Sequence, residues 1–301
     1  MTLDLSGIMV ATVTPFTPDG AAIDHDWIPA HLHFLEQAGI RSVFPLGTNG
    51  EGPSVGLEER RRLVETVVAN KGGLGVVVGV GTPALPDTIR AANDALEAGA
   101  DAIAILPPFF EAHVDSTGLL RYFDAVVDAI PAPGRVLLYN IPHKAQVDIP
   151  DDVVLALLDL HGDRVIGIKD SSGIVERTSR YLEIAQEAQS FTVLAGADAY
   201  HDVLYAAGCD GAVTGLGNAV PHLILAIQQA HRAGGDASRA QRELERLREM
   251  MTPYPSYAAL KQLIGITAKL SAPCVRPPQR DLTTEEQKNF EAAIVSYLRG
   301  E

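Results

Sequence analysis

A lysine ends a short apolar run in the middle of the chain. Val165–Ile168 is rich in β-branched residues and is bounded by polar residues, which predicts a buried parallel strand that ends at Lys169. Burial disfavours the charged form of an amine and leaves a neutral nucleophile that can attack a carbonyl group. An arbitrary lysine at a strand end more often extends its ammonium group to water. The chemical interpretation of Lys169 therefore depends on the residues that lie beside it.

A phenol and a glycine-rich loop follow two other apolar runs. Tyr139 ends the run Val136–Tyr139, and a phenol close to an amine or its iminium can relay protons. The alternative is a buried tyrosine whose hydroxyl is satisfied by a hydrogen bond. The glycines of Gly47–Gly52 allow backbone N–H groups to converge on an anion, and Thr48 adds a hydroxyl donor. An amine, a phenol and an anion site together suit a 2-oxo acid, because an imine of its ketone accepts electrons while the neighbouring carbon loses a proton or a carbon–carbon bond.

The elements that must position these groups alternate regularly along the chain. Short apolar runs are each followed by a stretch of helical periodicity, such as Leu57–Asn70, Pro83–Ala98 and Ser116–Ile130. Eight such units predict a protein of the α/β class, a closed (β/α)8 TIM barrel with its chemistry at the C-terminal ends of the strands. Tyr139 and Lys169 would then lie on neighbouring strands, about 4.8 Å apart. The expected strands are Ile8–Thr14, Ser42–Pro45, Val76–Val80, Ala102–Leu106, Val136–Tyr139, Val165–Lys169, Thr192–Ala195 and Gly211–Thr214.

The alternation gives way to helices alone in the last part of the chain. Pro221–Ala233 completes the barrel, and three more helices are expected at Ala237–Met251, Tyr257–Ala268 and Thr283–Arg299. The connections are rich in glycine and proline, but no low-complexity linker separates these helices from the barrel. We expect a catalytic barrel domain over residues 1–233 and a C-terminal helical region, packed on the barrel, over residues 234–301.

Composition restricts the possible partners. The chain has 301 residues, 47% of them hydrophobic, and a formal net charge of -14, which argues against a nucleic-acid partner and favours small-molecule substrates. No apolar run approaches the roughly 20 residues that span a bilayer, so no membrane role is expected. Two cysteines, with no basic segment before the apolar stretch near the N-terminus, favour a cytoplasmic location. The histidines do not form a ligand set, so we expect no metal and no cofactor.

The chain resembles the dihydrodipicolinate synthase and N-acetylneuraminate lyase superfamily of class I, Schiff-base-forming aldolases. The resemblance implies a barrel with a helical extension, a homotetramer or dimer, and Lys169 as the imine-forming residue. It also implies that Tyr139 relays protons and that Thr48 and Asn49 bind the substrate carboxylate. Further substrate contacts are expected within its motifs, at Gly47, Gly50, Gly211 and Val213. The motifs that carry the resemblance are Thr12–Phe16, Gly47–Glu51, Tyr139–Pro142, Gly167–Asp170 and Gly211–Asn218.

Three departures from the pattern bear on the substrate. Dihydrodipicolinate synthases of this superfamily have two tyrosines after the fourth strand, the second of which reaches a neighbouring subunit's site, whereas this chain has Phe109 and Phe110. Lys144 follows the tyrosine motif where those synthases have an arginine, and lysine lacks the bidentate fork. Asn49 replaces the second threonine of the usual pair. These differences argue against the condensation of pyruvate with aspartate semialdehyde.

The sugar-acid branch of the superfamily fits better. Asp198 stands where sialic acid lyases offer a carboxylate to a substrate hydroxyl, although an aspartate at this position could equally cap a helix. We therefore expect a carbon–carbon lyase that cleaves a 2-keto-3-deoxy sugar acid reversibly to pyruvate and an aldehyde. The alternatives are a 4-hydroxy-tetrahydrodipicolinate synthase, a dehydratase, a hydratase-aldolase with Phe109 and Phe110 in an apolar subsite, and a non-catalytic protein that binds a 2-oxo acid.

Overall fold

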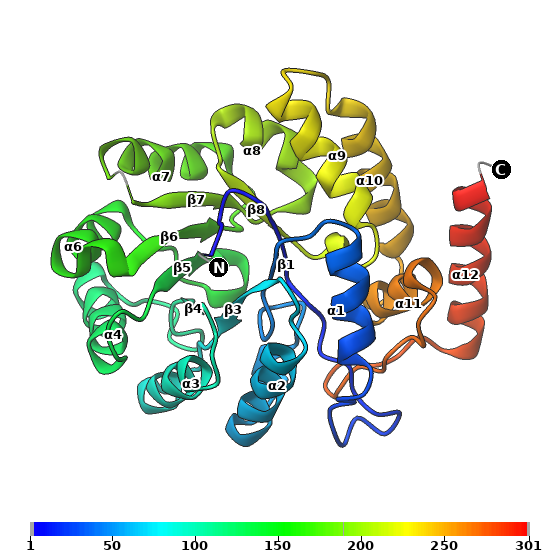
Figure 1. Ribbon diagram of the computed structural model, residues 1–301, viewed down its shortest axis with the longest axis horizontal. Helices are drawn as coiled ribbons and strands as arrows, with labels where there is room; N and C mark the ends of the chain where they lie inside the picture. Colours follow the sequence, from blue (N-terminus) through cyan, green and yellow to red (C-terminus); the bar gives the residue numbers. More distant parts are fainter. Residues whose placement is uncertain (1–2, 189, 300–301) are drawn as a thin grey trace.

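Eight parallel strands close into a barrel. The computed structural model describes residues 3–188 and 190–299, and in it each strand is hydrogen-bonded to the next in chain order, with β8 returning to β1 (Figure 1). This arrangement confirms the predicted (β/α)8 TIM barrel. The strands are β1 (Ile8–Val10), β2 (Ser42–Val43), β3 (Gly75–Gly79), β4 (Ala102–Ile105), β5 (Val136–Asn140), β6 (Val165–Asp170), β7 (Thr192–Ala195) and β8 (Gly211–Thr214).

Helices surround the barrel, and α10, α11 and α12 extend it on one side, coloured yellow to red in Figure 1. The barrel helices are α1 (Ile28–Gln37), α2 (Leu57–Ala69), α3 (Leu85–Glu97), α4 (Ser116–Ala129), α5 (Pro142–Ala145), α6 (Asp151–His161), α7 (Val175–Glu187), α8 (His201–Ala207) and α9 (Pro221–Arg232). The C-terminal helices are α10 (Ser238–Met251), α11 (Ser256–Ala268) and α12 (Thr284–Arg299). Short 3-10 turns are η1 (Gly52–Ser54), η2 (Gly162–Arg164), η3 (Asp198–Tyr200) and η4 (Leu216–Asn218).

The strands bury both of their faces, and this divides the apolar core into two parts. Successive side chains of a strand point to opposite faces, so one set fills the barrel and the other packs under the helices. Leu138 and Ile168 belong to the outer part, whereas Tyr139 belongs to the interior with Phe44 and Val213. The apolar runs in the sequence are nearly continuous because neither face meets water. The same alternation turns the residue after Ile168 towards the barrel axis.

The first two strands are shorter than expected from the sequence. The chain leaves the β1 ladder after Val10, where backbone and side-chain bonds to loops replace strand pairing: Val13 N–H donates to Asn218 Oδ1 at 3.2 Å, and Thr14 Oγ1 donates to Gly50 O at 2.6 Å. Strand β2 ends before the turn at Leu46, whose φ is 61°. The strands expected to end at Thr14 and Pro45 were therefore predicted too long, because these last residues belong to the loops at the mouth of the barrel.

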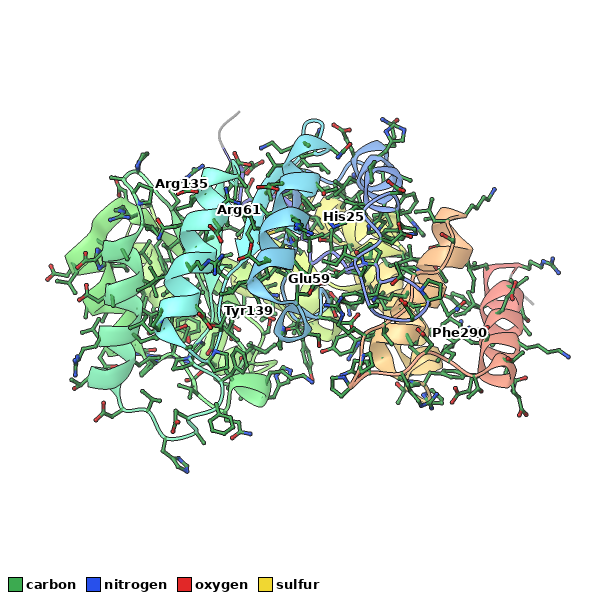
Figure 2. The ribbon with its side chains drawn as sticks, turned by 90° about the horizontal axis from the view of Figure 1, so that it is seen from below. His25, Glu59, Arg61, Arg135, Tyr139 and Phe290 are labelled. Carbon is green, nitrogen blue, oxygen red and sulfur yellow. The ribbon has the colours of Figure 1, made fainter. Side chains whose placement is uncertain are left out.

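The C-terminal helices pack on the barrel and on each other. Helix α10 packs against α9, α11 contacts η4 after the last strand, and α12 covers α10 and α11. Tyr254 and Phe290 meet edge to face with ring centroids 5.2 Å apart, and Figure 2 shows Phe290 by α12, well to one side of Tyr139. Residues 1–2, 189 and 300–301 of the two expected regions lie outside the described residues. Among residues 3–188 and 190–299, no helix is both long and apolar enough to span a membrane.

Candidate active site

Lys169 and Tyr139 lie side by side at the C-terminal end of the barrel. They are partners in the register between β5 and β6, and both are buried, with 4% and 3% of their surfaces exposed. The Lys169 Nζ atom lies 3.9 Å from the centroid of the Tyr139 ring and 4.8 Å from that of Phe44. The Phe44 and Tyr139 rings pack edge to face, 5.6 Å apart. The amine therefore stands against aromatic faces rather than extending to water.

The glycine-rich loop after β2 brings Thr48 to the phenol. Thr48 Oγ1 and the Tyr139 hydroxyl are 2.9 Å apart, so a proton can pass between them along a hydrogen bond. Close packing requires glycine in this loop, because a Cβ at Gly52 would lie 2.3 Å from Leu46 O and one at Gly50 would lie 2.8 Å from Leu46 N. Gly52 N–H donates within the turn, to Gly47 O at 3.2 Å. The part of the loop that can face an anion is therefore the segment around Thr48.

A cavity of about 240 Å³ opens beside the phenol. Phe109 and Lys144 line it, as do Thr48 and Tyr139, and Tyr257 enters from helix α11. Its remaining walls are mostly apolar or glycine residues of the barrel mouth. A volume of this size holds a small molecule, and one cation and several hydroxyl groups can orient it. The other lining residues are Phe44, Leu46, Gly47, Gly52, Pro53, Gly79, Gly81 and Leu106.

Asn49 and Asp198 line a second cavity, of about 520 Å³. Asp198 Oδ2 accepts hydrogen bonds from the N–H groups of Gly215 at 3.1 Å and Leu216 at 2.9 Å, and its Oδ1 lies 3.4 Å from Nε2 of the buried His201. Burial lowers the pKa of His201, and the Asp198 charge opposes that change. Asp198 therefore stabilises the turn after β8, and the helix-capping interpretation was wrong because η3 has Ala197 as its N-cap residue and no side-chain cap hydrogen bond.

Four predicted contact residues, Gly50, Phe110, Gly211 and Val213, line neither cavity, and Lys169 is not among the lining residues either. Phe110 is 85% exposed, whereas the neighbouring Phe109 lines the cavity, so of the two phenylalanines expected in an apolar subsite only Phe109 is placed for it. Gly211 begins β8 at the end of the barrel opposite Lys169, and a Cβ there would lie 2.2 Å from Leu5 O. Its lack of a side chain serves chain packing, so a substrate contact at this residue was wrong. Val213 is buried in the barrel interior.

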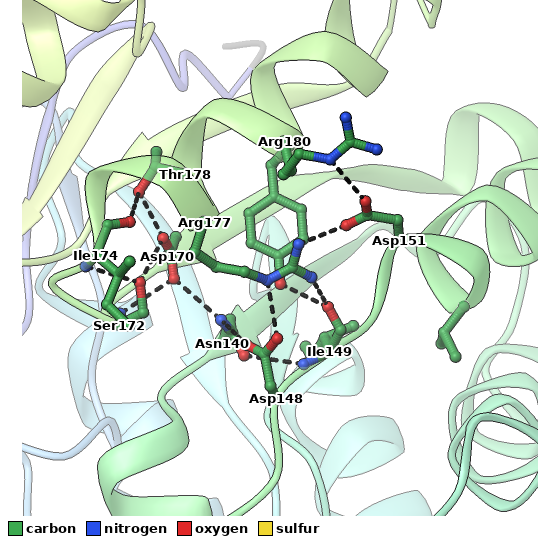
Figure 3. A network of polar contacts seen from close by, with 12 residues as sticks. Asn140, Asp148, Ile149, Asp151, Asp170, Ser172, Ile174, Arg177, Thr178 and Arg180 are labelled. Carbon is green, nitrogen blue, oxygen red and sulfur yellow. Dashed lines mark hydrogen bonds and ion pairs between the residues drawn. The ribbon is translucent and has the colours of Figure 1, made fainter.

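A buried polar network holds the residues that follow the phenol and the lysine. Asn140 Nδ2 donates to Asp170 Oδ1 at 3.0 Å and to Asp148 Oδ1 at 2.8 Å, and the Thr178 hydroxyl donates to Asp170 Oδ2 at 2.6 Å. The Arg177 Nε atom lies 2.8 Å from Asp148 Oδ2 and closes the network towards α7 (Figure 3). Because adjacent side chains point to opposite faces of a strand, this network fixes β5 and β6 from outside the barrel.

Sequence reasoning missed a buried ion pair beneath the loop. Lys261 Nζ on α11 lies 2.6 Å from Glu51 Oε1 and donates to Cys274 O at 2.7 Å, and both charged side chains are 1% exposed. Arg276 N–H donates to the other Glu51 oxygen at 3.2 Å. Tyr257, on the same helix, was missed too. These residues are about two hundred positions from the loop in sequence, so no local pattern could have paired them.

A group of possible metal ligands lies outside the barrel. Asp124 and Asp128 on α4 and His161 at the end of α6 bring ligand atoms within 4.8 Å of one another. His161 Nε2 is 2.9 Å from Asp124 Oδ1, the geometry of a hydrogen-bonded pair. The expectation from sequence that histidines join no ligand set did not foresee this arrangement, which is on the helical layer and not at the barrel mouth.

Comparison with known proteins places the chain in a family. The model of the dihydrodipicolinate synthetase family matches residues 4–297. The chain belongs to this family. It is 38% identical to an uncharacterized DapA-like lyase of Chloroflexus aurantiacus, over 98% of this chain and 97% of that protein. It is 32% identical to the 4-hydroxy-tetrahydrodipicolinate synthase of Sorangium cellulosum, over 96% of this chain and 97% of the synthase.

A solved structure supports the same assignment. The chain superimposes with a TM-score of 0.89 on YagE, a prophage protein of the dihydrodipicolinic acid synthase family from E. coli K12, solved in complex with pyruvate. The two share 28% sequence identity, and the match covers 96% of this chain and 97% of YagE. The family resemblance expected from the sequence motifs is thus confirmed across the chain, and the family consists of lyases and aldolases.

Proposed function

We propose that the chain is a class I lyase that forms a Schiff base between Lys169 and pyruvate or another 2-oxo acid. The observation that carries the proposal is the placement of the buried Lys169 amine 3.9 Å from the Tyr139 ring, while the Tyr139 hydroxyl lies 2.9 Å from Thr48 Oγ1. A nucleophile, a proton relay and a small cavity meet at one end of the barrel, where enzymes of this fold have their active sites. Pyruvate in the YagE complex supports the same substrate class.

The residues suggest a sequence of steps for cleavage. The Lys169 amine adds to the ketone, and loss of water, with one proton supplied by the Tyr139 and Thr48 pair, gives a protonated imine. The bond between the third and fourth carbons then breaks: its electron pair moves into the imine to form an enamine, and the proton of the fourth-carbon hydroxyl passes to the Tyr139 and Thr48 pair. The pair returns a proton to the third carbon, and hydrolysis of the imine releases pyruvate and restores the amine. The loop around Thr48 and Asn49 would bind the carboxylate.

We propose a hydroxylated aldehyde as the second product, from a 2-keto-3-deoxy sugar acid. The larger cavity of about 520 Å³ is lined mainly by polar and charged side chains, which suit a chain of hydroxyl groups. Asp198 can offer a substrate hydroxyl only its Oδ1 atom, because its Oδ2 already accepts two backbone hydrogen bonds. Support for the sugar acid therefore rests on the whole lining rather than on this carboxylate. The polar members are Asn49, Asp198, Tyr200, Glu245, Arg248, Glu249, Thr252 and Ser256.

A second candidate is the condensation of pyruvate with aspartate semialdehyde. Lys144 lines the smaller cavity and could attract the carboxylate of that aldehyde, although as a point charge and not as a fork. The similarity to a synthase favours this candidate as well. The Phe109 and Phe110 pair lacks the phenol that such synthases use. We therefore rank condensation second.

We also propose that the chain forms a homotetramer or dimer. The proposal rests on the family resemblance, and Phe110, which is 85% exposed, is a residue that another copy could cover. Sedimentation velocity with the full chain and with Phe110→Asp tests this, since loss of the oligomer in the variant is the expected result. The cytoplasmic location stays a prediction.

The experiment that tests the function is a pair of assays on the purified protein. A panel of 2-keto-3-deoxy sugar acids is screened for pyruvate release, and condensation of pyruvate with aspartate semialdehyde is measured in parallel. Lys169→Ala should abolish both activities, whereas Lys71→Ala, at the other end of the barrel, should leave them unchanged. Release of pyruvate with kcat/KM of about 10⁴ M⁻¹s⁻¹ or more would support the sugar-acid assignment. Efficient condensation without cleavage would make the synthase assignment correct.

A further inference from the structure

Tyr257 brings a second phenol into the cavity. It is in the first turn of α11 and lines the cavity together with Tyr139 and Lys144. The three side chains come from different parts of the chain, namely α11, β5 and α5. The C-terminal helices therefore do more than cover the barrel, because one of them contributes a residue with a hydroxyl group to the cavity that Tyr139 lines.

The buried ion pair holds this helix over the glycine-rich loop. Lys261 is four residues after Tyr257, so the two side chains leave α11 on the same face, one turn apart. Lys261 is bound to Glu51, which belongs to the loop that also carries Thr48. One end of this helical face is thus fixed to the loop, and the other end places Tyr257 at the cavity.

The environment of Tyr257 keeps its hydroxyl protonated. Burial raises the pKa of Tyr257, and the charges of Glu51 and Tyr139 act in the same direction. A phenol in this state donates a hydrogen bond at neutral pH and does not act as a base. Tyr139, in contrast, is already bonded to Thr48 beside the lysine. The two phenols are therefore suited to different roles, Tyr139 to proton transfer and Tyr257 to hydrogen-bond donation.

We propose that Tyr257 is a substrate-contacting residue whose hydroxyl donates a hydrogen bond to the oxygen of the aldehyde partner. This inference rests on the proposed function and adds a specificity determinant to it. Phe109, which also lines the cavity, has no hydroxyl group and cannot make this contact. Tyr257 would thus supply, from the same chain, a phenol for the second reactant.

The contact would matter only in the step that involves the aldehyde. In the direction of addition, the enamine carbon forms a bond to the aldehyde carbon, and the electron pair of the carbonyl moves to its oxygen. That oxygen takes a proton from the Tyr139 and Thr48 pair. Tyr257 keeps its own proton and stabilises the developing negative charge by hydrogen bonding, in the manner of an oxyanion-hole donor.

The test compares Tyr257→Phe with the wild type and with Tyr254→Phe. Tyr254 lies just before the same helix and packs against Phe290, so its variant controls for removal of a nearby hydroxyl. Three readouts are needed: borohydride trapping with pyruvate, exchange of the pyruvate methyl protons in deuterated water, and kcat/KM for addition to glyceraldehyde or aspartate semialdehyde. The first two need no aldehyde.

We expect Tyr257→Phe to retain trapping and proton exchange within about twofold and to lose roughly 10²-fold in kcat/KM for addition, the usual cost of removing one such donor. Tyr254→Phe should change none of the three. Unchanged addition, or equal losses in exchange and addition, would overturn the inference. The inference would also be overturned if the wild type exchanges the pyruvate methyl protons but adds pyruvate to neither aldehyde. Failure of the proposed function would look different, because the wild type would then neither trap nor exchange pyruvate.

Discussion

Removal of the Lys261 ammonium tests how the C-terminal helices support the candidate site. In Lys261→Met the side chain keeps a similar length, but the Glu51 carboxylate, 1% exposed, loses its cation and keeps only the Arg276 N–H donor. Burial lowers the pKa of Lys261 and the Glu51 charge partly offsets this, so the pair is held at a desolvation cost. Breaking such a pair on one side costs about 3–5 kcal/mol because it leaves a buried charge unpaired.

The consequence is measurable by thermal unfolding. At about 2 °C per kcal/mol, the lower end of the range for chains of 150–250 residues, the melting temperature should fall by roughly 6–10 °C. Glu51→Gln/Lys261→Met should be more stable than Lys261→Met alone, because an amide costs less to bury than an unpaired carboxylate. The control is Lys71→Met, which breaks the half-buried pair with Asp101 and should cost about 1 kcal/mol or less.

The reasoning fails if Lys261→Met has the melting temperature of the wild type, or if Glu51→Gln/Lys261→Met is less stable than Lys261→Met. The first result would mean that the Glu51 carboxylate is not confined when its cation is removed. The second would mean that the lost amine, and not the remaining charge, is the source of the instability. The surviving folded protein should also bind pyruvate less well, because the loop that carries Thr48 loses its attachment to α11.

Three further predictions concern proton transfer by Tyr139, the loss of folding stability at low pH, and the buried polar network around Asp170. Tyr139→Phe should keep some imine formation but lower turnover by roughly 10²- to 10⁴-fold, with a smaller loss in Thr48→Val, as measured by pyruvate release; unchanged turnover would assign the proton to another group. Burial lowers the pKa of His31 to about 4. As the pH falls from 8 to 5, this histidine becomes protonated in the unfolded protein but stays neutral in the folded protein. About 2 kcal/mol of folding stability should therefore be lost over this range. His31→Gln should flatten this part of the pH profile of the melting temperature, and an equally steep profile would refute the assignment. Asp170→Asn should cost about 1–3 kcal/mol in denaturant unfolding, since an amide cannot accept every hydrogen bond that the carboxylate does; a wild-type midpoint would show that the network is not needed.

The barrel and its central pair could be predicted from sequence for a physical reason. Parallel strands that are buried on both faces leave nearly continuous apolar runs, so each of the eight strands was found, and the order along the chain fixed which strands are neighbours. Tyr139 and Lys169 end two such runs, and their register in the sheet brings them into contact. The local sequence pattern was sufficient here because the contact between Tyr139 and Lys169 follows from the pairing of β5 with β6.

The rest of the site depends on contacts that local pattern does not contain. Tyr257 reaches the cavity only because a helix from the end of the chain packs over a loop near its beginning. Gly211 was assigned by its place in a motif, although a strand has two ends and this glycine lies at the end away from the lysine. Phe109 and Phe110 are adjacent, and sequence alone does not show which one turns inward.

The measurement that tests the central claim most directly is the site of borohydride trapping. The full-length protein is incubated with pyruvate, reduced with borohydride, digested and mapped by mass spectrometry. The account predicts one reduced pyruvate adduct on Lys169, absent from Lys169→Ala, whose far-UV circular dichroism should match the wild type because no unpaired buried charge is created. An adduct on another lysine, or trapping that persists in Lys169→Ala, would contradict the assignment of this residue as the imine-forming nucleophile.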